Sequence, residues 1–275
     1  MERSKTSEQY AVAVGSESQT PARLLPFTPN SFQMKIAFIT DLHIAAEGEM
    51  PQGVDVRANF LKTLDFVRAM KPACLVLGGD LCYDTGDRAV YAWIREQLVD
   101  LPCTWFAIPG NHDNSVMMAE ALHLTHHLHD SELYFASPLE GYPALFLDSS
   151  KTQFSPAQWQ WLADELKAIH HNVLIFCHHP VLPANAEFMD TNYPFRQTEQ
   201  WIKLTRDLPC QMQVISGHYH MDAVAFRANT SVMITPSTYI QLDPNTPGIS
   251  LIKTSPALRE INMSPNGLTS RVHYV

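Results

Sequence analysis

The chain has 275 residues, enough to bury the core of one large domain or of two small ones. Hydrophobic residues amount to 45% and charged residues to 17%, a composition typical of globular proteins and unlike that of disordered chains. The formal net charge of −9 argues against a long nucleic acid as partner, because contacts to a phosphate backbone require clustered Lys and Arg residues.

The N-terminal part of the chain differs in composition from the rest. Residues 1–33 are polar and contain three prolines, which predicts a poorly ordered N-terminal extension or a strap across the surface. From residue 34 onward no linker interrupts the pattern, so residues 34–275 are predicted to form a single domain. This domain is expected to end in a β-hairpin over residues 258–275, because apolar and polar residues alternate on both sides of a Pro-Asn-Gly turn.

The first half of the predicted domain alternates between strands and helices. Short apolar runs at 36–40, 73–79 and 104–110 predict buried strands. Residues 56–71 and 87–100 carry apolar residues at helical spacing and predict helices. This β-α-β-α-β order is typical of parallel strands in a layered α/β fold.

The second half continues with more strands. A helix over residues 155–169 is predicted to begin at the N-cap Ser155, and a second helix spans 195–208. The predicted strands are 133–137, 144–150, 173–180, 213–220 and 232–242.

Cysteine usage and hydropathy indicate the compartment. The five cysteines are an odd number, are widely spaced and form no CxxC pair, so we expect reduced thiols in a cytoplasmic protein. The N-terminus lacks an apolar run of signal-peptide length. No stretch reaches the roughly 18 apolar residues that a membrane helix requires, and no membrane partner is expected.

Five of the predicted strands end on polar side chains. In open α/β sheets, ligands bind beyond the carboxyl ends of the strands, so these side chains are expected to meet at one edge. Asp80 follows Gly78 and Gly79, which let the backbone turn tightly beneath it. The polar groups at the five strand ends are Asp41 and His43, Asp80, Asn111 to Asp113, His178 and His179, and His218 and His220.

The chemistry of these side chains points to metal ions. Carboxylate, carboxamide and imidazole ligands without a cysteine suit Mn, Fe, Zn or Co rather than Ca or Mg. Seven candidate ligands are too many for one ion that also keeps a water. They suit two ions about 3.5–4 Å apart that share a bridging carboxylate, an arrangement used for phosphoryl chemistry.

The ordered set of motifs resembles the calcineurin-like metallophosphoesterase superfamily over residues 36–242. Within this superfamily the chain is most similar to the class III 3′,5′-cyclic-nucleotide phosphodiesterases and to the related glycerophosphodiesterases. The resemblance implies a four-layer αββα sandwich, in which two mixed β-sheets are flanked by helices. The stretches that carry it are FITDLHIA, GGD, IPGNHD, FCHHPVLP, SGHYH and TPSTYIQLDP.

The resemblance also implies a role for each residue of the site. Asp80 would bridge the two ions, and His112 would lie near the leaving group. Asp113 would then orient His112 through a ring N–H, as carboxylates behind metal sites do. The first ion would be held by Asp41, His43, Asp80 and His220, and the second by Asp80, Asn111, His178 and His218.

The expected reaction is hydrolysis of small phosphodiesters, with 3′,5′-cyclic nucleotides such as cyclic AMP as the first candidates. Two dications, two carboxylates and a bridging hydroxide sum to a local charge of about +1, which matches one phosphodiester anion. The hydroxide would attack in line while His112 protonates the departing alkoxide. The alternatives are a glycerophosphodiesterase, a broad-specificity phosphodiesterase or phosphatase, and a catalytically silent metal-binding scaffold.

Several residues keep two interpretations. Asn111, His179, Thr238 and Tyr239 are candidate substrate contacts. Thr238 and Tyr239 fit strand packing equally well, and His179 is expected to be a structural or substrate-facing residue rather than a metal ligand. The shape of the substrate pocket is expected to come from 113–135, 183–197 and 236–247. The histidines between His123 and His129 predict a solvated helix or a helix at the rim of the site. The 113–135 segment and the C-terminal hairpin are the candidate contacts of a homodimer.

Overall fold

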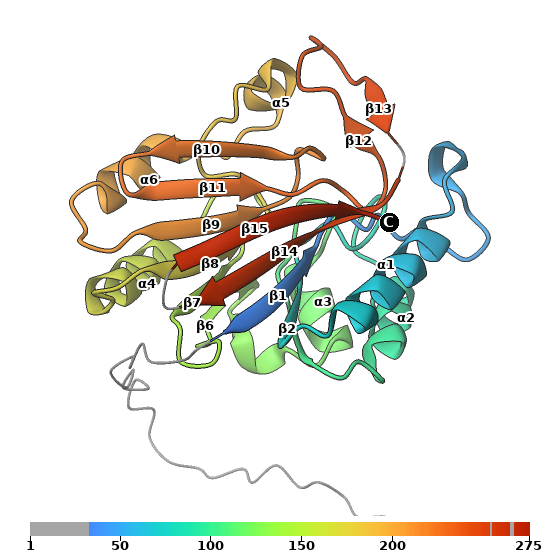
Figure 1. Cartoon of the computed structure of the whole chain (residues 1–275), viewed down its shortest axis with the longest axis horizontal. Coiled ribbons are helices and arrows are strands. Elements are labelled where there is room, and N and C mark those ends of the chain that lie inside the picture. Colours follow the sequence, from blue (N-terminus) through green and yellow to red (C-terminus); the bar gives the residue numbers. More distant parts are fainter. Residues whose placement is uncertain (1–32, 254, 265–266) are drawn as a thin grey trace, which may run out of the picture.

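The computed structural model describes residues 33–253, 255–264 and 267–275, so the predicted N-terminal extension lies outside the described residues except for its last one. Two large β-sheets form the centre of the molecule (Figure 1). Both sheets are mixed, with parallel strands in the middle and antiparallel strands at one edge or both.

The first sheet has five strands. β1, β2 and β3 are parallel, and β14 pairs antiparallel with both β1 and β15. The β14–β15 pair is the predicted C-terminal hairpin. In spatial order the strands are β15 (Gly267–Tyr274), β14 (Ala257–Ser264), β1 (Met34–Ile39), β2 (Cys74–Leu77) and β3 (Thr104–Ala107).

The second sheet has six strands. β11, β9, β8 and β7 are parallel, while β10 and β6 close the two edges in the antiparallel direction. In spatial order they are β10 (Ala223–Arg227), β11 (Thr230–Ile234), β9 (Met212–Ser216), β8 (Val173–Cys177), β7 (Ala144–Leu147) and β6 (Phe135–Ala136).

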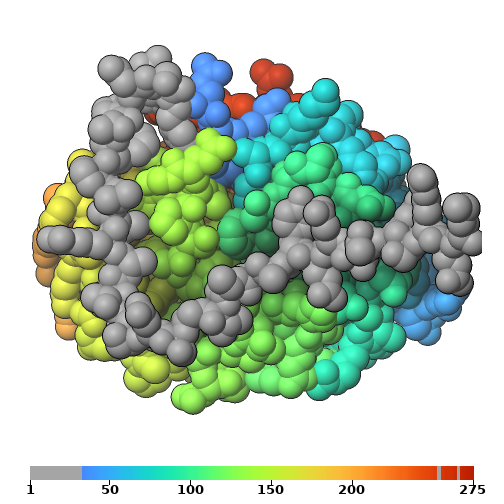
Figure 2. All heavy atoms as spheres, turned by 90° about the horizontal axis from the view of Figure 1, so that it is seen from below, coloured from blue at the N-terminus to red at the C-terminus, as the bar shows by residue number. Residues whose placement is uncertain are grey.

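Helices cover the outer faces of the two sheets. In several of these helices an N-cap side chain accepts backbone N–H groups of the first turn, as Asp55, Asp87 and Ser155 do. Ser155 is the N-cap that the sequence predicted. In Figure 2 yellow and orange atoms lie on one side and cyan and green atoms on the other. The helices are α1 (Val56–Met70), α2 (Arg88–Leu98) and α3 (Ser115–Ala121) on the first sheet, and α4 (Pro156–Ala168) and α6 (Thr198–Thr205) on the second.

Three apolar clusters separate the layers. One lies between the first sheet and its helices, and another lies between the second sheet and α4 and α6. The third joins the inner faces of the two sheets through side chains such as Phe38, Phe146 and Phe176. The order helix, sheet, sheet, helix confirms the αββα fold that the sequence resemblance implied.

Short elements lie in the connections. Figure 1 shows α5 and the β12–β13 pair at the same end of the molecule. These elements are the 3-10 helices η1 (Pro51–Gly53) and η2 (Thr125–His127), the strands β4 (Leu128–His129) and β5 (Glu132–Leu133), α5 (Glu187–Asn192), and the strands β12 (Gln241–Leu242) and β13 (Leu251–Lys253).

Two predictions about these elements are wrong in detail. The strand predicted over 232–242 is split into β11 and β12, because residues 235–240 leave the sheet and bond to the loop after β1. The histidines between His123 and His129 do not form one helix, since α3 ends at Ala121 and the chain turns at His123, which has a positive φ of 61°.

Candidate metal centre

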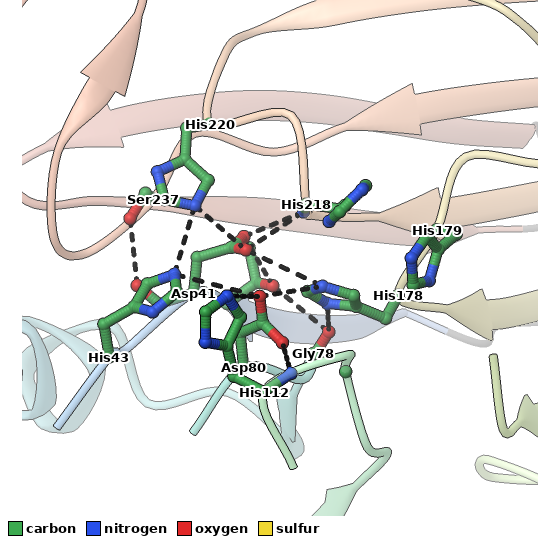
Figure 3. A network of polar contacts seen from close by, with 12 residues as sticks. Asp41, His43, Gly78, Asp80, His112, His178, His179, His218, His220 and Ser237 are labelled. Carbon is green, nitrogen blue, oxygen red and sulfur yellow. Dashed lines mark hydrogen bonds and ion pairs between the residues drawn. The ribbon is translucent and has the colours of Figure 1, made fainter. Parts of the chain in front are cut away.

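Five loops bring the predicted ligands together at one edge of the two sheets. The loops follow β1, β2 and β3 of the first sheet and β8 and β9 of the second. Figure 3 shows side chains from these loops pointing toward a common centre. The clustering follows from topology, because parallel strands place their carboxyl ends at the same edge.

The backbone at the centre is strained. Residues other than glycine rarely adopt a positive backbone φ, and such conformations concentrate at functional sites. Five of the predicted ligands adopt one: Asp41 (54°), His43 (45°), Asp80 (51°), His218 (67°) and His220 (50°).

Two glycines let these loops approach each other. Gly79 has a φ of 96°, and a Cβ there would lie 2.6 Å from His178 Nδ1. A Cβ on Gly110 would collide with the carboxylate and backbone N of Asp80 and would lie 2.8 Å from His178 Nε2. The glycine before Asp80 and the one before Asn111 are therefore required by the close contact of the β2 and β3 loops with β8.

The carboxylates are held in place by backbone groups. Asp41 accepts the backbone N–H of His218 at 3.0 Å and the hydroxyl of Thr40 at 2.9 Å. Asp80 accepts the backbone N–H of His112 at 2.8 Å through Oδ1. Its other oxygen, Oδ2, faces the ring nitrogens and is placed between the two groups of histidines.

The histidine rings are oriented by carbonyl groups. A carbonyl only accepts, so the ring nitrogen that contacts it carries the proton and the other nitrogen keeps a lone pair for a metal. The Nδ1 contacts are His43 to Tyr83 O (3.4 Å), His178 to Gly78 O (2.8 Å) and His220 to Ile240 O (2.8 Å). His218 instead uses Nε2, which lies 3.0 Å from Tyr193 O, and so leaves Nδ1.

The resulting lone pairs fit metal ions. His43 Nε2 lies 3.2 Å from His220 Nε2, and two lone pairs this close repel unless a cation or a proton lies between them. His178 Nε2 is buried without a hydrogen-bond partner and lies 3.3 Å from Asp80 Oδ2. Two groups able to hold an ion are Asp41 with His43 and His220, and Asp80 with His178 and His218, and a third group joins His43 and Asp80 to His112.

The pKa values match this arrangement for His43, His218 and Asp41 but not for His178 and His220. Burial lowers the pKa of His43 to about 4, although Asp80 opposes the shift. Burial likewise lowers the pKa of His218 to about 4. Burial alone would raise the pKa of Asp41, but His220 and His178 outweigh it and lower that pKa to about 2. Neutral imidazoles and ionised carboxylates are the forms that bind metals.

Burial would lower the pKa values of His178 and His220 as well, but the carboxylates of Asp80 and Asp41 outweigh it. They raise the pKa of His178 to about 9 and also raise that of His220, so an ion would have to displace a proton from His178.

His112 lies beside this cluster and near the surface. Its Nδ1 donates to the carbonyl of Asp84 at 3.0 Å. Its Nε2 lies 4.0 Å from Asp80 Oδ2, and its side chain is 34% exposed. Consecutive carbonyls of one loop, those of Tyr83 and Asp84, therefore orient a predicted metal ligand and the predicted proton donor.

Asp113 has a different role from the one predicted. Its carboxylate does not take the ring N–H of His112, which goes to Asp84. Instead it accepts the backbone N–H groups of Gly110, Leu81 and Cys82 and the hydroxyl of Tyr91. Burial, reinforced by the charge of Asp80, raises the pKa of Asp113 to about 6. Asp113 thus fastens the β2 loop to the β3 loop.

A family model for the calcineurin-like phosphoesterases matches residues 34–222, which include every predicted metal ligand. The chain belongs to this family. The match covers most of the chain, and it confirms the resemblance drawn from the motifs. The family fold implies divalent metal ions, and the two groups of ligand atoms described above fit them.

The chain is similar to curated bacterial proteins that include the following two. It is 31% identical to a probable cyclic nucleotide phosphodiesterase of Fibrobacter succinogenes, covering 88% of this chain and 94% of that protein. It is 28% identical to the 3′,5′-cyclic adenosine monophosphate phosphodiesterase CpdA of Haemophilus influenzae, covering 85% and 87%.

Solved structures share the fold at low identity. A dimetal phosphatase from Danio rerio superposes with a TM-score of 0.62 at 15% identity, covering 86% of this chain and 98% of that one. GAP50, the anchor in the inner membrane complex of Plasmodium, superposes with a TM-score of 0.59 at 11% identity, covering 88% and 84%. Because one is named a phosphatase and the other an anchor, the fold alone does not decide the function.

A cavity of about 340 Å³ opens over the candidate metal ligands of this phosphoesterase. Of the predicted substrate contacts, Asn111 and Tyr239 line it. Thr238 is buried and donates to the carbonyl of Asp41, and His179 is buried with its ring Nδ1 2.9 Å from Ser149 Oγ. In Figure 3 His179 lies to the right of His178 and His218 and farther from the centre, and neither His179 nor Thr238 lines the cavity, so the structure gives both packing positions.

Other cavity residues were missed by the sequence analysis. The segments 183–197 and 236–247 contribute to the lining, as expected, but 113–135 contributes none of the described lining residues. Tyr83 and Asp84 directly follow the GGDLC motif, and this proximity to Asp80 was the available signal. Gln52 and Ile249 carried no signal, since neither lies near a motif.

The part of the chain that the structure describes contains no helix with the length and apolar character of a membrane span.

All five cysteines are free, as the sequence predicted. The thiol of Cys82 accepts the backbone N–H of Asp87 at 3.3 Å and so helps to shape the loop that carries Tyr83 and Asp84.

Proposed function

We propose that this phosphoesterase hydrolyses small phosphodiesters, with 3′,5′-cyclic nucleotides such as cyclic AMP as substrates. The observation that carries the proposal is the clustering of six of the predicted ligands next to His112, which is oriented by the Asp84 carbonyl and reaches the cavity. The six are Asp41, His43, Asp80, His178, His218 and His220. The names of the two bacterial relatives support the choice of substrate.

The cavity requires metal ions to bind an anion. No Lys or Arg is among the described residues that line it, and Asp80 adds negative charge. When bound, two ions would neutralise the phosphate oxygens and lower the pKa of a water toward about 7. We propose that Asp41, His43, Asp80 and His220 hold one ion, and that Asp80, Asn111, His178 and His218 hold the other. Mn, Fe, Zn and Co all suit this mixture of ligands.

His112 serves as the proton donor in this scheme. With Nδ1–H bonded to Asp84, the ring presents Nε2 toward the centre, and the protonated ring can deliver a proton from Nε2 to the departing alkoxide. Asp113 does not share this proton. It holds the loop of His112 against the loop of Asp80, and so keeps the donor at a fixed place.

Hydrolysis assays with added Mn test the proposal. We expect turnover of bis-p-nitrophenyl phosphate far above that of p-nitrophenyl phosphate, and turnover of cyclic AMP. Faster turnover of the monoester would indicate a phosphatase. Turnover of glycerophosphodiesters alone would indicate a glycerophosphodiesterase. No turnover of any ester by fully metallated protein would favour the silent scaffold.

A cytoplasmic location and a homodimer stay predictions.

A further inference from the structure

The cavity over the metal ligands has two unlike sides. Its floor is formed by polar side chains of the metal centre, including His43, Asp80, Asn111 and His220. One wall is apolar and comes from α5, from β12 and from the segments next to them. The residues of this wall, here called the apolar wall, are Phe188, Met189, Tyr193, Leu242 and Ile249.

The apolar wall has a fixed position relative to the metal ligands. The carbonyl of Tyr193 lies 3.0 Å from His218 Nε2, so the end of α5 is tied directly to the metal centre. The rings of Phe188 and Tyr193 contact each other with centroids 5.8 Å apart. Phe188, Met189 and Leu242 also meet around a small gap between α5 and the β12–β13 pair, so the two elements pack together.

Part of the wall exposes apolar surface to water. Ile249 is 65% exposed and Tyr193 is 48% exposed, although both line the cavity. Contiguous exposed apolar surface at the edge of a cavity is typical of a ligand-binding site. Tyr83 and Tyr239 also line the cavity beside His43, and their rings meet edge to face with centroids 5.9 Å apart.

We propose that the apolar wall is the subsite for the nucleobase of the substrate and sets the preference for nucleotide esters over small polar esters. The inference deepens the proposed function and depends on it. A flat, uncharged ring system suits aromatic and aliphatic side chains, because every base offers a π-face. The lining residues include no Lys or Arg that would attract a second anionic group. The volume of about 340 Å³ falls in the range of small-ligand sites.

The chain provides a matched pair of variants for the test. Ile249 and Ile252 belong to the same hairpin and are similarly exposed, at 65% and 61%, but only Ile249 lines the cavity. The variants are Ile249→Ser and Phe188→Ser, with Ile252→Ser as the control. The substrates are cyclic AMP and the 3′,5′-cyclic phosphate of methyl riboside, which keeps the reacting ring and lacks the base.

We expect KM for cyclic AMP to rise about tenfold in Phe188→Ser and severalfold in Ile249→Ser, because contacts to a base act in the ground state and the transition state alike. KM for the baseless ester and all kinetics of Ile252→Ser should stay at wild-type values. Equal rises in KM for both esters, or no rise for either, would overturn the subsite.

A second measurement separates this inference from the proposed function. If wild-type protein turns over bis-p-nitrophenyl phosphate but not cyclic AMP, the proposed substrate is wrong. The wall is then tested with adenosine as a competitive inhibitor, which Phe188→Ser should weaken about tenfold if the wall binds a base. Unchanged inhibition, or a loss of affinity only for glycerophosphocholine, would assign the wall to another group and overturn the inference.

Discussion

Tyr91 should be essential to the stability of the two loops that present Asp80 and Asn111. Its buried hydroxyl donates to Asp113 Oδ1 at 3.0 Å and accepts the backbone N–H of Asn114 at 3.0 Å. In Tyr91→Phe the carboxylate loses one donor, and the N–H of Asn114 loses its acceptor. A hydrogen bond to a charged group contributes about 1.5–3 kcal/mol, and an unpaired buried donor costs about 1–3 kcal/mol.

Part of this cost is offset, because the variant no longer buries a hydroxyl group. We therefore expect the free energy of unfolding to fall by about 3 kcal/mol, a large fraction of the roughly 5–15 kcal/mol of a typical domain. Urea unfolding with excess chelator measures it, since metal binding would otherwise stabilise the folded state. The Mn affinity of the refolded variant should fall as well.

Tyr142→Phe is the control for this experiment. Tyr142 donates to the neutral amide oxygen of Gln213 at 3.1 Å, away from the metal centre. We expect a loss of about 1 kcal/mol and unchanged Mn affinity. If Tyr91→Phe costs no more than Tyr142→Phe and binds Mn as the wild type does, then Asp113 does not depend on Tyr91 and the reasoning is wrong.

Three further predictions concern the centre and its surroundings. Gly110→Ala should abolish Mn binding in a metal titration, because the new Cβ would lie 2.8 Å from His178 Nε2. Gly248→Ala is the control and should bind Mn as the wild type does, because a Cβ there has nothing within 4 Å. His112→Gln should slow hydrolysis of cyclic AMP by about 10²–10⁴-fold. Hydrolysis of bis-p-nitrophenyl phosphate should slow much less, because nitrophenolate leaves without a proton. Equal losses for the two substrates would contradict the role of His112 as proton donor. Burial lowers the pKa of His127 from 6.5 to about 4, so the unfolded chain binds more protons between these values and stability should fall as the pH drops through this window. Thermal unfolding of His127→Phe should lose this part of the pH dependence, and that of His171→Phe, at an exposed site, should keep it.

The sequence predicted the fold and the clustering of the candidate ligands better than the cavity. His178 directly follows β8, and Asp80 follows β2 after two glycines, so a short apolar run and the residues after it were enough to place these candidate ligands. The layer order followed from alternating strands and helices. Both signals are local, and the topology of parallel strands converts them into three-dimensional positions.

The walls of the cavity could not be predicted in the same way. α5 is six residues long and its side chains show no clear helical period, so Phe188 carried no pattern. Ile249 lies in a hairpin whose strands have two and three residues. The predicted hydrogen-bond partner of Asp113 was also wrong. Whether its carboxylate accepts the ring N–H of His112 or backbone N–H groups depends on how the loops after β2 and β3 meet, and the spacing of residues in the sequence does not show this.

Manganese binding by wild-type protein and by Asp80→Ala tests the central claim most directly. Titration and electron paramagnetic resonance should show two Mn ions per wild-type chain with an exchange-coupled spectrum, since a shared carboxylate keeps such ions about 3.5–4 Å apart. Asp80→Ala should lose the coupled spectrum together with hydrolysis. A single uncoupled ion in the wild type, or an intact coupled pair in Asp80→Ala, would contradict the account.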